Sequence, residues 1–357
     1  MGAIANFGAK RDTGIVKLGE LSGLEVLGAL FSILSAAAFA LNNASVRRGV
    51  ISGTPIQAMA ISVPLGVVCF LPIAWIAGEL GRVAQFPAKA AAWMAGLGVL
   101  HFVIGRYFNF KANQVAGTNL TAPVIQLQAV VTMVLAVAIL HEPCTLLQAF
   151  GGVVMVAGSL ITQRQPPQTA AAPPPATAEK PALPPFIPLY LAGYVFASGA
   201  AIAYGTTPIM ARFALAHTGP STGILGGLIA YLSATTVVGL VFLTSAPLRR
   251  NAGGMRLDNA RWFAFSGVLV AAAQGFFFCA VALAPVLFVM PLLQTSLAFR
   301  MLFSTWLSPH HEVFGGLVIS GVVISLSGAL LVSMDSGMIV HALALPDALA
   351  RVLLWQV

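Results

Sequence analysis

The chain has 357 residues, of which 58% are hydrophobic and only 8% are charged, whereas a typical soluble protein has about 25% charged residues. Together with a mean hydropathy of +0.91, this composition excludes a soluble enzyme and a DNA-binding domain, despite a formal net charge of +8. The low charge, 35 glycines and 22 prolines instead predict an all-α polytopic membrane protein. We therefore expect the chain to lie in a lipid bilayer and to bind no nucleic acid.

Ten apolar segments are each long enough to form a transmembrane helix of about 20 residues. They are residues 24–43, 55–78, 91–113, 118–140, 144–163, 187–214, 221–245, 262–284, 286–308 and 313–334. The N-terminal lead, 1–23, is basic, as the start of a signal peptide would be. Because the following apolar run continues into the polar pair Asn42-Asn43, we expect a retained first span instead of a cleaved leader.

Two segments fall outside this pattern. Residues 164–186 form a linker rich in proline, alanine and threonine, which cannot build a packed core and which divides the spans five and five. Residues 335–357 form an apolar tail that is interrupted by Pro346. Asp347 and Arg351 share one face of any helix there, so we expect an amphipathic tail at the membrane interface instead of an eleventh span.

The two halves of the chain repeat each other. The pattern Glu142-x8-Gly151-x6-Gly158 recurs as Glu312-x8-Gly321-x6-Gly328, and Pro123-x2-Gln126 recurs as Pro291-x2-Gln294. A repeat with an odd number of spans places its second copy upside down in the membrane. The sequence therefore predicts ten transmembrane helices in two inverted five-helix repeats, 24–163 and 187–334, which is an architecture of secondary transporters.

The same motifs resemble a known family. The tract from Asn109-Phe110-Lys111-Ala112 through Pro123 to His141-Glu142-Pro143, and its second copy from Val281-Ala282-Leu283-Ala284-Pro285 through Pro291 to His311-Glu312, are similar to EamA-type members of the drug/metabolite transporter superfamily. The resemblance implies a multi-pass protein of the cell (inner) membrane with both termini in the cytoplasm. It also implies efflux of amino acids or related metabolites. The basic residues divide almost evenly between the two sides and do not themselves decide the orientation.

Ionisable groups inside apolar segments are candidates for function, because each costs about 2.5–3.5 kcal/mol at the bilayer centre. Arg300 lies in the middle of the ninth segment, and Ser296, Arg300 and Ser304 form one polar stripe at i, i+4 and i+8. The repeat matches this stripe with Gln128 and Thr132 in the fourth segment. We predict that both pairs border a shared central cavity, although Arg300 could instead satisfy neighbouring carbonyls.

Arg106, in the third segment, is the second candidate for substrate binding. Asn109 and Asn113 lie below it on the same helix face, and its repeat counterpart is Gln274. Arginine suits a carboxylate or phosphate because its planar fork donates two parallel hydrogen bonds. Since no Asp or Glu lies near mid-span in either repeat, the two arginines predict an anionic group on the substrate.

Other polar residues have weaker assignments. Gln126 and Gln294 lie on another face of their helices and either edge the cavity or bond between helices. His101 is a candidate for proton coupling, with a packing role as the alternative. Glu142 and Glu312 lie at span ends, where we expect them to fix loop geometry or to cap the next helix.

No catalytic motif, phosphate-binding loop or metal-binding run is found, so we predict no enzyme activity, no cofactor and no metal. The adjacent His310 and His311 lack the separation that lets ligands converge on a metal. Gly321, Ser325 and Ala329 form a small-residue ladder that predicts close helix packing, inside the monomer or in a homodimer.

These features together predict a secondary transporter, an exporter or exchanger, of a small metabolite such as an amino acid or organic acid. It would work by alternating access around a midplane cavity. The alternative is a membrane scaffold or sensor that binds a ligand or lipid in the same cavity without transporting it.

Overall fold

The computed structural model describes residues 23–141, 144–163, 186–215, 223–283, 289, 292–308, 312, 315–333, 336–337, 340, 343–344 and 346–355. Within these ranges the chain is helical and contains no β-strand, in agreement with the all-α fold expected from the sequence. The predicted N-terminal lead and nearly all of the predicted linker lie outside the described residues.

The helices of the first half match its five apolar segments. They are α1 (Gly23–Val50), α2 (Pro55–Ile76), the 3-10 helix η1 (Glu79–Gln85), α3 (Ala88–Gly98), the π-helix η2 (Val99–Gly105), α4 (Arg106–Ala116), α5 (Thr118–Gln126), α6 (Gln128–Leu140) and α7 (Leu146–Gln163). The third apolar segment thus runs through α3, η2 and α4, and the fourth through α5 and α6.

The described helices of the second half are α8 (Tyr190–Leu215), α9 (Gly223–Thr244), α10 (Ala246–Gly253), α11 (Leu257–Leu283), α13 (Ser296–Leu307), α14 (Gly316–Ser333) and α16 (Asp347–Leu353). In the described part of the chain, seven helical stretches are long and apolar enough to cross a membrane. The predicted segments 144–163, 187–214 and 286–308 are not among these seven, and α7 counts as a shorter apolar helix.

Two helices are interrupted at matching places. Between α5 and α6, the amide of Leu127 donates to the Val124 carbonyl at 3.1 Å, which is a three-residue step instead of the four-residue step of an α-helix. Just before α13, the amide of Thr295 donates to the Leu292 carbonyl at 3.2 Å in the same way. Leu127 and Thr295 occupy equivalent positions in the sequence repeat, so both halves bend at the same point.

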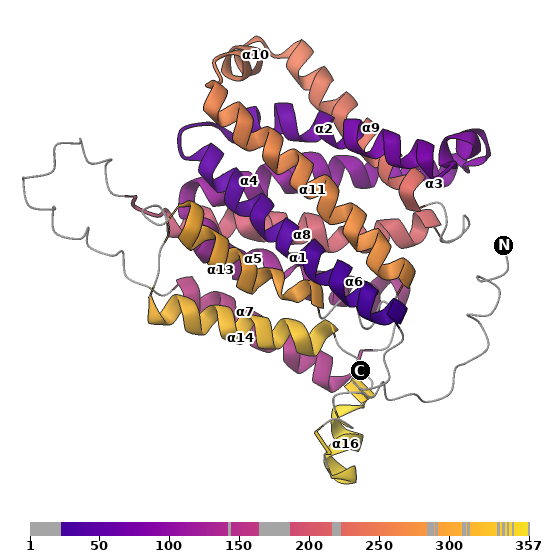
Figure 1. Cartoon of the computed structure of the whole chain (residues 1–357). Helices are drawn as coiled ribbons and strands as arrows, with labels where there is room; N and C mark the ends of the chain where they lie inside the picture. Colours follow the sequence, from indigo (N-terminus) through magenta and orange to yellow (C-terminus); the bar gives the residue numbers. More distant parts are fainter. Residues whose placement is uncertain are drawn as a thin grey trace, which may run out of the picture.

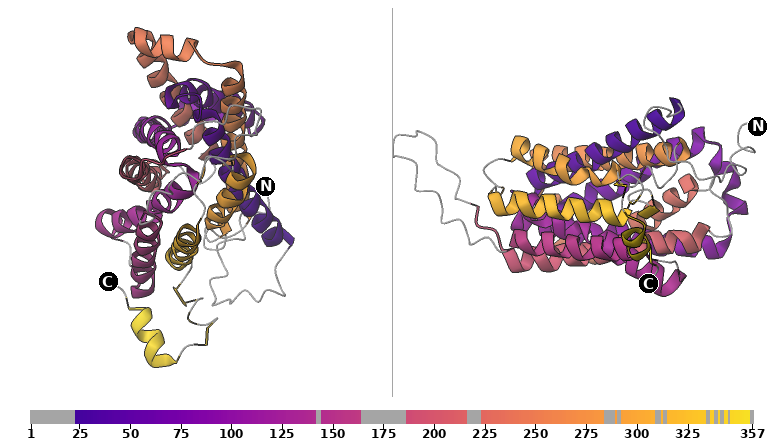
Figure 2. Two further views of the ribbon diagram at one scale, coloured as in Figure 1. Left: turned by 90° about the vertical axis from the view of Figure 1, so that its left-hand side faces the viewer. Right: turned by 90° about the horizontal axis from the view of Figure 1, so that it is seen from below.

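The helices pack in reciprocal pairs (Figures 1 and 2). α1 packs along α11, whereas α8 packs along α4 and η2. The contact of α11 with α2 is matched by the contact of α3 with α9. In the same way, the contact of α13 with α1 is matched by that of α6 with α8. The pairs α2 with α9 and α7 with α14 join equivalent helices of the two halves. These contacts therefore occur in pairs in which the two halves of the chain exchange roles.

Glycines bring α7 and α14 into direct backbone contact. A Cβ atom at Gly151 would lie 3.0 Å from the Gly328 carbonyl oxygen, and one at Gly158 would lie 2.7 Å from the Gly321 carbonyl oxygen. Ser325 is fully buried in the same seam. The predicted close packing of the small-residue ladder is therefore confirmed, and it occurs inside the monomer.

α1 begins and α14 ends at one end of the bundle, which we call the α16 end (Figure 1). There the carbonyl of Trp355 accepts a hydrogen bond from the Leu146 amide at 2.9 Å, which attaches the C-terminal segment to the start of α7. Leu349, Val352 and Trp355 are exposed, as an amphipathic tail requires. At the opposite α10 end, α1 and α9 finish while α5, α11 and α14 begin.

Candidate functional site

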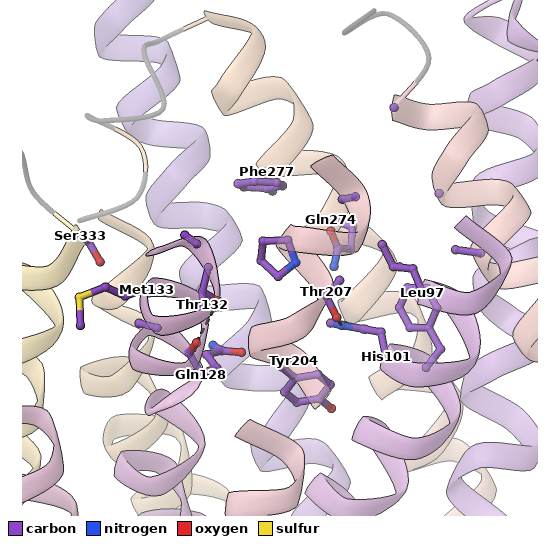
Figure 3. Close-up of a pocket in the computed structure, with 18 of the residues that line it drawn as sticks. Leu97, His101, Gln128, Thr132, Met133, Tyr204, Thr207, Gln274, Phe277 and Ser333 are labelled. Carbon is purple, nitrogen blue, oxygen red and sulfur yellow. Dashed lines mark hydrogen bonds between the residues drawn. The ribbon is translucent and has the colours of Figure 1, made fainter. Parts of the chain in front are cut away.

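A cavity of about 760 Å³ lies between helices of the two halves (Figure 3). It is lined by Phe70, Met94, Leu97, His101, Phe102, Gln128, Ala129, Thr132, Met133, Ala136, Val137, Cys144, Gln148, Tyr204, Thr207, Pro208, Ala211, Gly223, Gly227, Ala230, Tyr231, Gln274, Phe277, Gln294, Val332 and Ser333. The cavity extends from Gln128 and Gln294, beside the two bends, to Gln148, Gly223 and Ser333 at the α16 end.

The cavity walls are aromatic and carry no formal charge. The rings of Phe102 and Tyr231 stack with centroids 3.9 Å apart, and those of His101 and Tyr204 lie 4.6 Å apart. None of the lining residues that the structure describes is Asp, Glu, Lys or Arg. A ligand in this cavity therefore meets aromatic faces and neutral hydrogen-bonding groups.

The polar groups form two facing sets. Gln128 and Thr132 lie on one side of the cavity, while His101, Thr207 and Gln274 lie on the other (Figure 3). The Thr132 hydroxyl donates to the carbonyl oxygens of Gln128 and Gly205 and is satisfied within the protein. The side-chain amides of Gln128 and Gln274 are among the polar groups of the lining that a ligand can bond.

His101 has a defined hydrogen-bonding polarity. The Thr207 hydroxyl donates its single hydrogen to the Ala203 carbonyl at 3.0 Å, so its oxygen must accept the 3.0 Å hydrogen bond that joins it to His101 Nδ1. In the neutral imidazole the proton is therefore on Nδ1, and Nε2 is an acceptor. His101 lies within the π-helix η2, a type of helix frequent at functional sites.

Five of the nine predicted site residues line the cavity: His101, Gln128, Thr132, Gln274 and Gln294. Gln126 is buried beside it and donates from its amide to Gln294 Oε1, while Gln294 donates to Ser333 Oγ at 2.7 Å. The expected interhelical bonding of these two glutamines is confirmed, and it joins equivalent residues of the two halves.

Arg106 is buried but does not line the cavity. Its Nη1 donates to the Ser62 carbonyl at 3.1 Å, and its guanidinium carbon lies 5.0 Å from the Phe102 ring centre and 5.9 Å from that of Tyr231. Arg106 therefore lies behind the aromatic wall, where cation–π contact and a carbonyl satisfy part of its charge. The sequence pattern placed it at the cavity, and packing on α2 places it outside.

Arg300 also lies outside the cavity lining, and so does Ser296. Arg300 is only 8% exposed, and within the described part of the chain neither its Nε nor its Nη1 has a hydrogen-bond partner. One turn further along α13, Ser304 donates to Asn119 Oδ1 at 2.6 Å. The expectation that neighbouring carbonyls satisfy the guanidinium is therefore not met at these two nitrogens. Such a group is costly to bury.

The carboxylate of Glu312 closes the α10 end. We call Glu312, Arg47 and the backbone amides of Thr118 and Asn119 the Glu312 latch. Glu312 Oε1 accepts from the Thr118 amide at 2.8 Å and lies 3.3 Å from Arg47 Nε, and Oε2 accepts from the Asn119 amide at 2.9 Å. The carboxylate thus caps the positive N-terminus of α5 from the opposite half of the chain. From the sequence we expected Glu312 to fix loop geometry or to cap the next helix; in the structure it caps α5 and not α14.

Gly117 makes room for the latch. Its φ of +82° lies in the region that favours glycine, and a Cβ there would lie 2.8 Å from Glu312 Oε2. Arg47, only 1% exposed, donates from Nη1 to the carbonyls of Asn113 at 2.6 Å and Gln114 at 2.9 Å. The latch therefore joins α1, α4 and α5 to the segment before α14.

Residues 26–164 match the EamA-like transporter family. The resemblance noted in the sequence is thereby confirmed for the first half of the chain. A solved crystal structure of a protein aligns over 86% of this chain and 95% of its own, with 15% identity and a TM-score of 0.51, and this likeness concerns the fold alone. Among curated proteins, none matches the chain.

One central residue of this chain was not singled out from its sequence. Arg47 follows the predicted first span, 24–43, and looked like an ordinary basic residue at a span end. In the structure α1 continues to Val50, so Arg47 is inside the bundle. The repeat offered a signal, because it marked Glu312 as an acidic residue that recurs. An acidic residue inside a membrane protein needs a cation nearby. Glu142, the repeat counterpart of Glu312, lies outside the described residues.

Proposed function

We propose that this chain is a secondary transporter that moves a small metabolite across a membrane by alternating access. The observation that carries the proposal is the difference between the two ends of the bundle. A large cavity runs from the bends to the α16 end, while the Glu312 latch closes the α10 end. A binding cavity that reaches one end and is sealed at the other is what one state of such a cycle requires.

The proposal includes ten spans in two inverted five-helix repeats, with the termini on the same side and in the cytoplasm. Three observations support the repeat. Both halves bend at equivalent residues, helix contacts occur in reciprocal pairs, and Gln126 bonds to its own counterpart, Gln294. The seam between α7 and α14 adds a fourth, because Gly151 meets Gly328 while Gly158 meets Gly321.

The π-helix η2 accounts for an irregularity in the repeat. Gly98 packs on Ala230 of α9, and Gly267 packs on Ser62 of α2, so these glycines are counterparts 169 positions apart. From Arg106 to Thr132, after η2, the spacing of counterparts is 168. A π turn holds one residue more than an α turn, and the extra residue in the first half restores the match.

The cargo that fits the present cavity is small and amphipathic. Aromatic faces would contact its apolar part, and Gln128, Gln274 and His101 would bond its polar groups. Amino acids and organic acids of modest size meet this description, and the direction of net movement would be export or exchange. We propose no catalytic step.

The test is a counterflow assay in proteoliposomes. A metabolite panel screened by thermal shift identifies a ligand, and labelled ligand is then followed into vesicles preloaded with the unlabelled compound. Uptake should depend on the preload and should fall strongly in Glu312→Gln, with Glu79→Gln as the control. Glu79 forms the second ion pair of the described chain, with Arg82, outside the cavity. Ligand binding without any exchange would contradict the proposal and favour a sensor or scaffold.

A further inference from the structure

Two neutral polar residues of the cavity have charged counterparts in the repeat. Gln274 and Thr132 line the cavity, and 168 positions separate each from an arginine, Arg106 and Arg300 respectively. Neither arginine lines the cavity. The two halves are thus alike in fold and unlike in the charge that they offer to a ligand.

The packing of the two arginines follows the same exchange of roles. Gln274 and Ala230 border the open cavity together, whereas Arg106 donates to the carbonyl of Ser62, the counterpart of Ala230. Thr132 faces the cavity, whereas Arg300 is enclosed on α13, between the bend at Thr295 and the latch-side bond from Ser304. Both arginines therefore occupy positions that are closed in this state and whose counterparts are open.

We propose that Arg106 and Arg300 form an anion site in the opposite state, in which the cavity reaches the α10 end. This inference rests on the proposed alternating access, because it takes the second state to be the first with the two halves exchanged. The cavity would then be lined by Arg106 in place of Gln274 and by Arg300 in place of Thr132. Its ligand is a carboxylate or a phosphate group, which the guanidinium fork binds through paired hydrogen bonds.

Of the two arginines, Arg300 has the stronger structural support for this role. Its Nε and Nη1 are buried N–H donors, and both lack a hydrogen-bond partner within the described residues. No carboxylate is close enough to form an ion pair with it, since the ion pairs of the described chain are Arg47–Glu312 and Arg82–Glu79. A buried guanidinium left in this condition is explained if the opposite state supplies its partner.

The site would give the two sides of the membrane different affinities for one cargo. An anion would bind the state open at the α10 end more tightly and would shift the population toward that state. A cargo with a negative group and an apolar body would be held by charge on one side and by aromatic and amide contacts on the other. This difference would make the transporter asymmetric although its fold is symmetric.

The test measures which end of the cavity is open while an anion is added. Thr118→Cys reports the α10 end, because Thr118 is fully buried beside the latch. Cys144, which lines the cavity, reports the α16 end. All other native cysteines are replaced by alanine in each reporter, and maleimide labelling rates are measured in nanodiscs. Sodium phosphate, succinate and benzoate are compared with sodium chloride at equal ionic strength.

At least one of the three probes should raise labelling of Thr118→Cys relative to Cys144 by about fivefold or more, a usual lower value for coupling between a ligand and a conformational equilibrium. Arg300→Gln should abolish this response, and Arg300→Lys should keep part of it. Arg82→Gln, which removes a half-exposed arginine outside the cavity, should leave it unchanged. The proposal is overturned when no probe changes the labelling ratio, or when the response survives Arg300→Gln.

A melting temperature separates this role from a structural one. If Arg300 gains its partner only when an anion binds, Arg300→Gln in chloride removes an unpaired buried charge. The melting temperature should then stay the same or rise. A fall would assign Arg300 to structure and overturn the proposal. The anion site also fails separately from alternating access. If Glu312→Gln in chloride alone raises the labelling of Thr118→Cys, alternating access is supported even when no anion has an effect.

Discussion

The two ends of the bundle are built from different chemical groups, charged at one end and neutral at the other. At the α10 end, a carboxylate, a guanidinium and two backbone amides close the space between the halves. At the α16 end, aromatic rings and neutral amides border a cavity of about 760 Å³. If the elements at both ends are counterparts in the proposed repeat, one fold holds a closed and an open end at once. A shift between two such states need change only which end carries the closing contacts.

The largest test of this comparison is Glu312→Gln. Breaking one partner of a buried ion pair typically costs about 3–5 kcal/mol, and here that loss falls on the closed end alone. Labelling of Thr118→Cys should rise more than tenfold while labelling of Cys144 falls. Maleimide kinetics on both reporters measure the ratio. An unchanged ratio in Glu312→Gln, matching that of Glu79→Gln, would mean that the latch does not hold the α10 end closed.

A smaller effect in the same direction is expected from Gly117→Ala. The added methyl group would meet Glu312 Oε2 and would also sit at a φ of +82°, a strain of about 1–3 kcal/mol. Gly78→Ala separates the two causes, because Gly78 has a φ of +71° and nothing within 4 Å of the added Cβ. The labelling ratio should change several-fold in Gly117→Ala and stay constant in Gly78→Ala. Equal ratios in the two variants would show that the carboxylate contact has no effect on closure.

The seam between α7 and α14 is common to both ends, so Gly321→Ala should weaken the protein without favouring either end. Its Cβ would lie 2.8 Å from the Gly158 carbonyl, and the helices would have to separate. The melting temperature should fall by several degrees at an unchanged labelling ratio. Gly239→Ala, in α9 with open space around it, should instead raise stability by about 1 kcal/mol. A changed ratio in Gly321→Ala would tie the seam to the choice of open end.

The smallest change concerns one proton in the open end. Thr207→Val removes the oxygen that accepts from His101 Nδ1 and should allow the proton to move to Nε2. Nitrogen-15 NMR of labelled histidine, with His101→Gln to assign the signals, measures which nitrogen carries the proton. The adjacent Thr206→Val, whose hydroxyl bonds only the Ile202 carbonyl, should leave it on Nδ1. A proton on Nε2 in the unmodified protein would contradict the hydrogen-bonding polarity assigned here.

The sequence predicted helices well wherever apolar residues run without interruption. α2, α9 and α14 begin and end within a few residues of the predicted segments, because length and hydropathy are local properties of the chain. The end of α1 was placed too early, since polar residues from Asn42 onward suggested water. In the structure Asn43 is bonded by Asn109 inside the bundle, so tertiary partners replace the solvent that the local pattern implied.

The candidate site could be predicted only in part, for a related reason. The repeat paired Thr132 and Gln274 with buried arginines and Gln128 with Ser296, and these three neutral residues line the cavity. A sequence repeat cannot tell which copy of a pair is open in a given state, because that choice belongs to the conformation. The arginines were therefore assigned to a cavity that, in this state, is bordered by their counterparts.

The bond between Gln126 and Gln294 has a consequence of its own. These residues are counterparts, so exchanging the conformations of the two halves maps the pair onto itself, with donor and acceptor interchanged. In the proposed alternating access, a contact on this axis is the same in both states and contributes nothing to the difference in free energy between them. It can therefore be as strong as packing allows without slowing the transition by favouring one side. Gln126 and Gln294 are thus a point about which the two halves can tilt while the membrane-buried amides stay satisfied throughout.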